Sequence, residues 1–370
     1  MLTARRRSRV QTLMSTDIAA YMRFRAQIFT LTDICPRTII MENPFPYSDT
    51  NRRFYTYDYY MRRQFGAKCA KIPIDGGFTC PNIDGTVGVG GCAYCALASD
   101  GHRRDLRPLG QQYEEHLSAL RRKWEGCLGV PYFQDYTCTY APTTRLRELY
   151  EQALALPGAV GMHIATRADC LPEPVLDLLS EVNDRTHLVV ELGLQTVHDE
   201  TARRIGRGHD YAAFLRGYES LRERGIRVCV HIINGLPGED REMMLETARE
   251  LARLHVFSVK IHLLHIMRGT RLADRYEAGE FSEMSLETYV STVVSQLERL
   301  PTETVIGRVT GDGAADGLIA PLWSRKKFVV MNEIDKELVR RGSMQGSRYA
   351  ENAGGGERSL LKRAWRKLFV

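Results

Sequence analysis

KIPIDGGFTCPNIDGTVGVGGCAYC, residues 71–95, begins with a short apolar run and continues into a glycine-rich segment that carries three cysteines. The run 71–75 has the length and composition of a β-strand, and the two glycines after it mark its end. Cys80, Cys92 and Cys95 then stand in a loop with few bulky apolar side chains. Packing of a hydrophobic core therefore does not explain why three thiols are gathered there.

Strand-like and helix-like segments alternate along the rest of the chain. Six short β-branched or aromatic runs, each followed by a longer stretch with helical periodicity, predict six βα units. The predicted strands are residues 71–75, 131–137, 159–166, 187–195, 226–233 and 257–266, and the predicted helices are residues 111–127, 143–156, 172–182, 211–225, 239–254 and 286–300. Six units imply an α/β fold with a parallel sheet, either a doubly wound open sheet or an open six-unit barrel. In both folds the loops after the strands carry function, and the cysteine loop is one of them.

The cysteine spacing favours a bound metal or cluster. Cys92 and Cys95 form a CxxC pair that can direct two thiolates at one centre, and eleven residues separate Cys80 from Cys92. The glycines in between permit a sharply curved loop, with backbone amides expected to turn toward the bound centre: Gly85, Gly88, Gly90 and Gly91.

Three occupants of this site compete. A structural zinc ion needs a fourth ligand, for which Cys69 and His102 are candidates. A redox CxxC of the thioredoxin type leaves Cys80 unexplained. A 4Fe-4S cluster with three cysteine ligands accounts for all three thiols and leaves one iron open for another ligand.

The charge of the chain is concentrated at its ends. Residues 1–40 carry seven Arg against two Asp, a net charge of +5, and residues 321–370 carry twelve Lys and Arg against five acids, a net charge of +7. The total of +6 leaves −6 for residues 41–320. Basic ends can steer a protein to a polyanion such as RNA, although solvated termini are the simpler explanation.

Composition indicates a cytoplasmic protein. Nine cysteines scattered irregularly over 370 residues do not resemble a disulfide framework, so we expect reduced thiols. The sequence has no run of about eighteen apolar residues, and we therefore expect no membrane span. Residues 1–50 are predicted to be a basic, poorly ordered extension, and residues 349–370 a flexible linker with a basic tail.

The cysteine pattern resembles that of the radical S-adenosylmethionine (radical SAM) superfamily, whose members carry three cysteines, the last two as CxxC, after the first strand of an open (β/α)6 barrel. The resemblance runs from Asn51 to Gly346. Four segments look closest to the YhcC-like group, which is related to the radical SAM domain of the elongator catalytic subunit: residues 71–95, ELGLQTVHDETARRIGRGH (191–209), HIINGLPGE (231–239) and VTGDGAADGLIAPLWS (309–324). The long spacing between the first two cysteines departs from the commonest pattern, CxxxCxxC, and agrees with the elongator-like branch.

The resemblance implies an open (β/α)6 partial barrel over residues 51–304 and a C-terminal extension over residues 305–348 that packs on it. It implies a 4Fe-4S cluster on Cys80, Cys92 and Cys95, with SAM bound to the open iron. An electron donor such as flavodoxin or ferredoxin would reduce the cluster. Bound SAM would then be cleaved to methionine and a 5′-deoxyadenosyl radical that abstracts hydrogen from the substrate.

The resemblance also assigns residues to SAM. Tyr94 would lie against the adenine, and Ile233 and Gly235 would complete the adenine site. Ordinary loop packing and a strand-to-helix turn are the alternatives for these three residues.

Four polar residues on the fourth predicted strand, or after the third and fourth, are further candidates for SAM binding. Glu191 and Gln195 share one face of the fourth predicted strand and are candidates for the ribose or methionine part. Arg167 and Arg207 are candidates for the SAM carboxylate or for an ion pair with Glu191, with a surface ion pair as the alternative.

Two histidines on the last predicted strand and a cysteine after the second predicted strand are weaker candidates. His262 and His265, with Lys260 on the face of His262, could bind substrate or relay protons. Packed, hydrogen-bonded histidines are the commoner case. Cys138 is expected to be a small apolar filler rather than a reactive thiol.

Three functions remain open from the sequence. The first is a radical SAM enzyme that modifies RNA, with tRNA as the candidate substrate. The second is a radical SAM enzyme that acts on a small metabolite or a protein side chain. The third is a zinc-binding interaction protein without catalytic activity.

Overall fold

A computed structural model describes residues 45, 47–96, 104–105, 107–311 and 317–349. The predicted N-terminal extension lies outside the described residues except for its last few positions, and the predicted linker and basic tail lie outside them except for Tyr349. His102, a candidate zinc ligand, also lies outside them.

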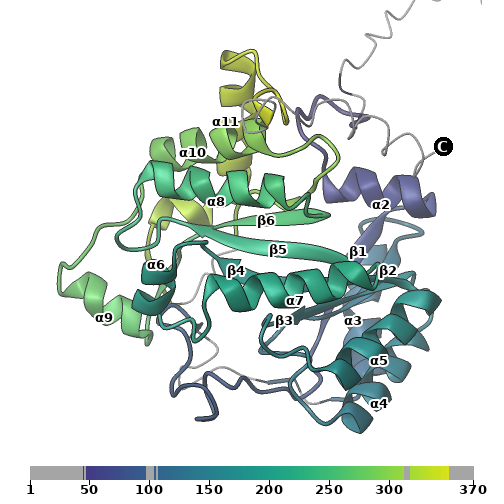
Figure 1. The fold of residues 1–370 in the computed structure, drawn as a ribbon. Coiled ribbons are helices and arrows are strands. Elements are labelled where there is room, and N and C mark those ends of the chain that lie inside the picture. Colours follow the sequence, from purple (N-terminus) through teal and green to yellow (C-terminus); the bar gives the residue numbers. More distant parts are fainter. Residues whose placement is uncertain (1–44, 46, 97–103, 106, 312–316, 350–370) are drawn as a thin grey trace, which may run out of the picture. The chain divides into compact units, whose positions relative to one another are not determined.

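The described residues form an α/β fold around a parallel sheet (Figure 1). All six predicted strands are present, with bounds within a few residues of those expected: β1 (Cys69–Ile74), β2 (Leu128–Phe133), β3 (Gly161–Thr166), β4 (His187–Gln195), β5 (Arg227–Asn234) and β6 (Ser258–Leu263). A seventh parallel strand, β8 (Val305–Arg308), extends the sheet in the order β1-β2-β3-β4-β5-β6-β8. The sheet forms an open half-barrel, which confirms the expected fold class. A separate antiparallel pair joins β7 (Ile266–Met267) to β9 (Leu318–Ala320).

The predicted helices are also present. They are α3 (Leu109–Arg121), α4 (Thr143–Leu154), α5 (Glu173–Arg185), α7 (Tyr211–Glu223), α8 (Arg241–Arg253) and α10 (Leu286–Arg299). Asp210, Asp240 and Ser285 begin α7, α8 and α10, and each side chain accepts a hydrogen bond from the backbone amide three residues on. The sequence analysis missed four short helices, α2 (Tyr57–Phe65), α6 (Asp199–Arg204), α9 (Arg271–Glu277) and the 3-10 helix Leu322–Arg325. It also missed the longer α11 (Lys327–Arg340), which contacts α10.

The sheet separates an apolar face from a polar one. Along β4, the side chains of Val190, Leu192 and Leu194 are fully buried in the main hydrophobic core. Glu191 and Gly193, on the opposite face, line a cavity. Because successive side chains of a strand point to opposite faces, the helices cover the apolar face and the polar face turns into the half-barrel.

The N-terminal part of the described chain lies at the opening of the half-barrel. The backbone amide of Ile306 in β8 donates to the carbonyl oxygen of Tyr55 at 2.7 Å, and Thr56 and Ile306 form a parallel β-bridge. The following helix, α2, contacts both edge strands, β1 and β8. This segment therefore brings Tyr57 to the inside of the half-barrel, where its hydroxyl lies 3.0 Å from Nε2 of His163.

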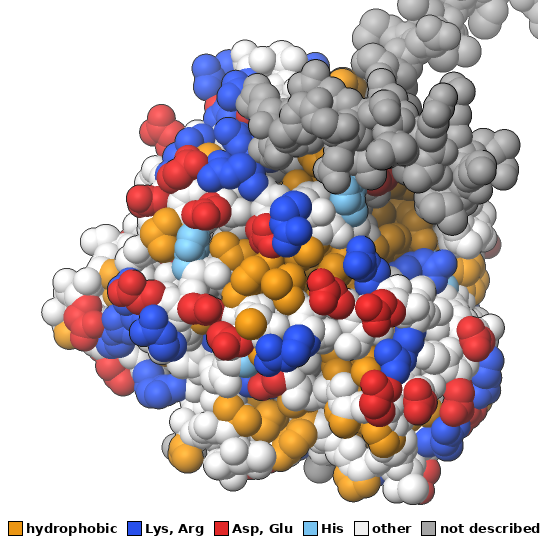
Figure 2. All heavy atoms as spheres, viewed as in Figure 1, with side chains coloured by type: hydrophobic (Ala, Val, Ile, Leu, Met, Phe, Trp, Pro, Cys, Tyr) orange, Lys and Arg blue, Asp and Glu red, His pale blue; other side chains and the backbone are white. Residues whose placement is uncertain are grey.

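The surface around the helices carries both charges. Figure 2 shows Lys and Arg side chains interspersed with Asp and Glu on the face it presents. Ion pairs also join charged side chains of neighbouring helices, as in Arg147 with Glu181 and Arg185 with Glu151. In the part of the chain that the structure describes, none of the helices has the length and apolar character needed to cross a membrane.

Candidate functional site

Most of the predicted site residues line one cavity. This first cavity, of about 430 Å³, lies between the cysteine loop (residues 76–95) and the polar face of the sheet. Ile233 lines an adjoining cavity of about 350 Å³, and Gly235 lines neither cavity. The other eight predicted site residues all line the first cavity: Cys80, Cys92, Tyr94, Cys95, Arg167, Glu191, Gln195 and Arg207.

The cysteine loop is fixed in place by the segment that follows α6. Asn82 donates from Nδ2 to the carbonyl oxygen of Gly206 at 2.7 Å, and the same nitrogen lies 3.5 Å from Sγ of Cys92. The amide of Ala93, inside the CxxC turn, donates to the carbonyl oxygen of Ile205 at 2.8 Å. The turn that carries two of the three cysteines is thus held from outside as well as by its own hydrogen bonds.

The glycines of the loop serve its curvature, but several of their amides do not face the cavity. Gly85, Gly90 and Gly91 have positive φ values of 95°, 76° and 72°, which glycine adopts without steric cost. The amides of Gly85, Gly88 and Gly91 donate to carbonyl oxygens of the loop itself. The expectation that the amides turn toward the bound centre is therefore wrong for these three residues, because the loop uses them to hold its own fold.

The three thiols fit a cluster better than a single zinc ion. A tetrahedral zinc ion with Zn–S bonds of about 2.3 Å holds its sulfur ligands about 3.8 Å apart. The three cysteine sulfurs do not meet that spacing: among the described residues, the one set of three Cys, His, Asp or Glu ligand atoms within 4.8 Å of one another lies elsewhere, at Glu191, Cys229 and His231. Cys69, the other candidate fourth ligand, begins β1 and does not line the first cavity.

Cys92 is a buried thiol that loses its proton less readily than a free cysteine. Burial raises the pKa of the Cys92 thiol, and the neighbouring Tyr94, Arg167 and Asn82 side chains oppose that rise only in part. A thiolate at this position therefore needs a positive partner, which an iron-sulfur cluster provides. The donor set and its environment fit the cluster that the sequence predicts.

Tyr94 and Gln195 form a pair beside the cysteines. The Gln195 amide donates from Nε2 to the Tyr94 hydroxyl at 2.8 Å, while its buried Oε1 has no hydrogen-bond partner. Gln195 has a φ of 65°, and the register of β4 against β5 shifts between Gly193 and Gln195. The kinked strand end therefore presents a buried, unsatisfied acceptor to the cavity, which a ligand N–H group can satisfy.

Arg167 and Arg207 are held by other partners and do not pair with Glu191. Arg167 forms a bidentate ion pair with Asp169, with N–O distances of 2.9 and 2.7 Å, and also donates to the carbonyl oxygen of Arg207 at 2.7 Å. Arg207 is 2% exposed and donates to the carbonyl oxygens of Leu194, Thr196 and His209. The proposed ion pair between Glu191 and either arginine is therefore wrong.

One nitrogen of Arg207 remains available for a ligand. Its Nη2 is buried without a hydrogen bond and lies 3.8 Å from the Asp199 carboxylate. Burial lowers the pKa of this guanidinium from its usual value, and it remains charged at neutral pH. Arg207 lines the first cavity, and this nitrogen is its one buried donor without a hydrogen-bond partner.

Gly235 is explained by its backbone. Its φ of 87° is one that side chains rarely adopt, and its amide contacts Sδ of Met244 at 3.3 Å. The turn after β5 thus requires a glycine whether or not a ligand lies nearby.

Glu191 is the centre of a buried polar cluster that draws one side chain from each of the first six strands. Its Oε1 accepts from Lys71 Nζ at 2.8 Å and lies 2.6 Å from His163 Nδ1. Its Oε2 accepts from the Tyr132 hydroxyl at 2.7 Å, lies 2.6 Å from His231 Nε2 and accepts from Lys260. We call these six residues the Glu191 cluster. Its carboxylate is fully used by protein groups, so the structure does not support a direct contact with SAM.

The charges in the Glu191 cluster follow from its burial. Burial alone would raise the pKa of Glu191, but the ammonium groups of Lys260 and Lys71 hold it well below its usual range. Burial lowers the pKa of His163 to about 3 and that of His231 to about 4. Both imidazoles are therefore neutral at pH 7 and donate to Glu191 from the nitrogen that faces it.

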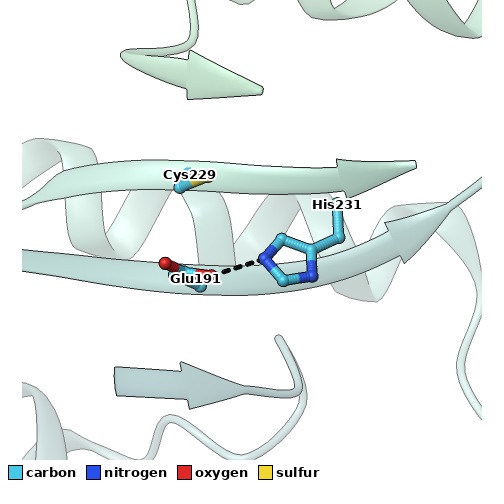
Figure 3. Close-up of side chains that lie close together, drawn as sticks. All are labelled: Glu191, Cys229 and His231. Carbon is cyan, nitrogen blue, oxygen red and sulfur yellow. Dashed lines mark hydrogen bonds and ion pairs between the residues drawn. The ribbon is translucent and has the colours of Figure 1, made fainter. Parts of the chain in front are cut away.

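Figure 3 shows the His231 ring directed at Glu191, with Cys229 beside them on β5. These three residues have the spacing of a metal site. Two ammonium groups already neutralise the single carboxylate, so a cation here would meet like charge. We therefore assign this group to the protein's own ion pairs.

The three weaker candidates, His262, His265 and Cys138, lie in different surroundings. His262 lines both the first cavity and the adjoining one, its buried Nε2 has no hydrogen-bond partner, and burial lowers its pKa well below the usual range. His265 lines only the adjoining cavity. Cys138 is fully buried in the main core, as expected of a filler.

Sequence reasoning missed four members of the Glu191 cluster and one residue beside it. Lys71, Tyr132, His163 and His231 each stand between apolar residues on a strand, and Arg308 follows them on the unpredicted strand β8. Each of these four residues is a polar residue in the middle of an apolar strand, and this pattern was the signal in the sequence that could have identified them.

Comparison with known proteins shows to which family the chain is similar. Residues 85–251 match the Radical SAM superfamily, and residues 256–340 match the Radical_SAM C-terminal domain. YtqA of Bacillus subtilis (strain 168) is 48% identical over 310 residues, which are 83% of this chain and 96% of YtqA. YhcC of Escherichia coli (strain K12) is 39% identical over 289 residues, 78% of this chain and 92% of YhcC.

The similarity to elongator proteins is more distant. Elongator complex protein 3 of Drosophila melanogaster is 29% identical over 157 residues, which are 41% of this chain and 28% of that protein. The solved structure of Elp3 from the archaeon Methanocaldococcus infernus, lacking residues 1–46, superposes with a TM-score of 0.57 at 17% identity and covers 76% of this chain and 67% of that one. At this identity the match shows a shared fold.

Proposed function

We propose that this chain, which belongs to the radical SAM superfamily, is an enzyme that cleaves SAM reductively at a 4Fe-4S cluster. The observation that carries the proposal is the position of Cys80, Cys92 and Cys95 on the wall of the first cavity, opposite the polar face of the half-barrel. Three thiol ligands leave one iron for SAM.

Several residues would position the two cofactors. Cys80, Cys92 and Cys95 would hold the cluster. When bound and reduced, the cluster supplies one electron that cleaves the carbon–sulfur bond of SAM, giving methionine and a 5′-deoxyadenosyl radical that takes a hydrogen atom from the substrate.

For SAM itself, we assign the adenine to the surface formed by Tyr94 and Ile233, which share the adjoining cavity. Gly235 would act only by shaping the turn that follows. Gln195, with its unsatisfied Oε1, would accept from an N–H group of SAM. Arg207 would donate to its carboxylate, and Arg167 would hold Arg207 in place through the hydrogen bond to its carbonyl oxygen.

Glu191 would act at a distance from SAM. It fixes the ammonium groups of Lys71 and Lys260 on the cavity wall, and it holds the neutral rings of His163 and His231 in one orientation. We therefore assign it a positioning role in place of the ribose or methionine contact predicted from the sequence.

We propose tRNA as the candidate substrate, a cytoplasmic location, and reduction by flavodoxin or ferredoxin. The basic ends of the chain and the similarity to elongator proteins support RNA, whereas the net charge of −6 over residues 41–320 favours a smaller substrate. The alternative is a small metabolite or a protein side chain. Comparison of modified nucleosides in tRNA from wild-type and deletion strains separates these two, since unchanged nucleosides would contradict the tRNA assignment.

Cluster content tests the proposal against the zinc alternative. The protein is purified anaerobically, and iron, sulfide and zinc are measured for wild type, Cys92→Ala and Cys69→Ala. We expect about four irons and four sulfides in wild type and in Cys69→Ala, loss of the cluster in Cys92→Ala, and a change in the electron paramagnetic resonance signal of the reduced cluster on adding SAM. Stoichiometric zinc without sulfide would overturn the proposal.

A further inference from the structure

A second cavity reaches the inside of the half-barrel from its open side. It has a volume of about 650 Å³ and lies between β1, β8 and the segment that leads into α2. Four residues line both this cavity and the first one: Tyr132, Gln134, Lys260 and Arg308. Cys80, Cys92 and Cys95 line only the first cavity, so a molecule in the second cavity can reach these four residues without passing the cluster site.

The junction of the two cavities carries excess positive charge. Lys71 and Lys260 share a single carboxylate, that of Glu191, and the two histidines bonded to it are neutral at pH 7. Buried charge is costly unless it is compensated. The Glu191 cluster therefore holds one more positive charge than negative charge, on a wall that both cavities share.

Lys260 presents that charge to the junction. Its Nζ donates to Glu191 Oε2 and to the Tyr132 hydroxyl, the latter at 3.1 Å, and an ammonium group has three donors. The third donor is therefore open to a ligand. Lys260 is 5% exposed and lines both cavities, so a ligand would reach its ammonium group from the cavities.

The neighbouring strand supports this arrangement. Arg308 in β8 is the register partner of Lys260 in β6 and lines the same junction. A Cβ at Gly307 would lie 3.1 Å from Cγ of Lys260, so glycine at this position leaves room for the lysine stem. His262, two residues along β6, extends the wall with its unpartnered Nε2.

We propose that this junction is the substrate subsite and that Lys260 and Arg308 bind an anionic group of the substrate, a carboxylate or a phosphate. The proposal rests on the proposed function, because it names the chemistry of the molecule that meets the radical. An anion at the junction compensates the excess charge and lies on the side of the first cavity away from the cysteines. A lysine and an arginine on adjacent strands suit either group, since both form charge-assisted hydrogen bonds to its oxygens.

Anion binding to the full-length protein tests the subsite independently of SAM cleavage. The probes are inorganic phosphate and acetate, titrated into wild type, Lys260→Met, Lys260→Arg and Arg308→Gln by calorimetry at low ionic strength. Lys336→Met is the matched control, because Lys336 is 70% exposed on α11 and lines neither cavity. Circular dichroism and melting curves show which variants fold.

We expect wild type and Lys336→Met to bind one of the probes. Lys260→Met and Arg308→Gln should each weaken that binding about tenfold or more, and Lys260→Arg should retain most of it. The tighter probe identifies the group as phosphate or carboxylate. No binding by wild type, or equal binding by all the folded variants, overturns the proposal.

A second titration distinguishes this subsite from the SAM site. With SAM present and no reductant, SAM stays intact, and we expect the probe to bind with unchanged affinity. Competition between SAM and the probe would assign the junction to the SAM carboxylate and overturn the substrate subsite, whatever the outcome for SAM cleavage. Failure of SAM cleavage with anion binding intact would instead count against the proposed function alone.

Discussion

The substitution Glu191→Gln tests the structural role of the Glu191 cluster. It removes the single negative charge that compensates Lys71 and Lys260, and it leaves both ammonium groups beside neutral partners. Removing one partner of a buried ion pair costs about 3–5 kcal/mol, because the remaining charge is left without compensation. Lys260 can relieve part of this cost, since burial already lowers its pKa to about 8 and loss of its proton at pH 7 costs about 1.4 kcal/mol.

We therefore expect the free energy of unfolding to fall by about 3 kcal/mol at pH 7, the lower end of that range. At about 2 °C per kcal/mol for a chain of this size, Tm falls by roughly 6 °C. Urea unfolding followed by circular dichroism measures the difference. Glu181→Gln is the control, because Glu181 is exposed and pairs with Arg147 at 2.6 Å, and the stability of this variant should stay close to that of wild type.

The difference in stability between wild type and Glu191→Gln should depend on pH. In Glu191→Gln the pKa of Lys260 falls below about 8, because the attraction of the carboxylate is lost. Between that lower pKa and pH 8 the folded variant has released a proton that the folded wild type still holds, so rising pH stabilises the variant relative to wild type. We expect the stability gap to be wider at pH 6 than at pH 8. A loss below about 1 kcal/mol at both pH values would refute the reasoning.

Two further predictions concern the loop and the buried histidines. In Gly88→Ala the new Cβ would lie 2.4 Å from Oδ1 of Asn82. We therefore expect the free energy of unfolding to fall by about 1–3 kcal/mol and the iron content after reconstitution to be lower. Gly110→Ala is the control, because its new Cβ would have its nearest neighbour at 3.9 Å, and it should match wild type in iron content. His163 and His231 have folded-state pKa values of about 3 and about 4, whereas a histidine in the unfolded chain has a pKa of about 6.5. Between pH 6.5 and pH 4 the unfolded state therefore binds more protons than the folded state. The free energy of unfolding consequently falls as the pH drops through this range. The urea midpoint of wild type should be lower at pH 5 than at pH 7, and the difference between the two midpoints should be smaller in His163→Gln. Equal midpoints of wild type at the two pH values would contradict this assignment.

The sequence was sufficient for six of the seven strands of the sheet and for the position of the cysteine loop. All six predicted strands exist because each is a run of apolar residues with β propensity, and the CxxC pair with an upstream cysteine placed the cluster site at the end of β1. The Glu191 cluster was also written in the sequence, as a polar residue between two apolar ones on each strand: Ala70-Lys71-Ile72, Pro131-Tyr132-Phe133, Met162-His163-Ile164, Val190-Glu191-Leu192, Val230-His231-Ile232 and Val259-Lys260-Ile261. Only Glu191 and Lys260 were singled out.

The partners of these residues required the three-dimensional structure. The register of parallel strands brings Lys71 and Lys260, which are far apart in the sequence, onto one carboxylate, and no local pattern specifies that register. Arg207 was a plausible partner for Glu191 by charge alone, but the turn after α6 directs its guanidinium to backbone carbonyls. Strand β8 was missed because it is only four residues long and contains a glycine, so its period-2 signal is short.

The fate of SAM tests the central claim most directly. Full-length protein carrying a reconstituted cluster is reduced anaerobically with dithionite and incubated with SAM, and the products are measured by liquid chromatography with mass spectrometry. We predict that wild type forms 5′-deoxyadenosine and methionine, and that Cys92→Ala, at the same protein concentration, forms neither above background. Intact SAM in the presence of cluster-loaded, reduced wild type would contradict the assignment of this chain as a radical SAM enzyme.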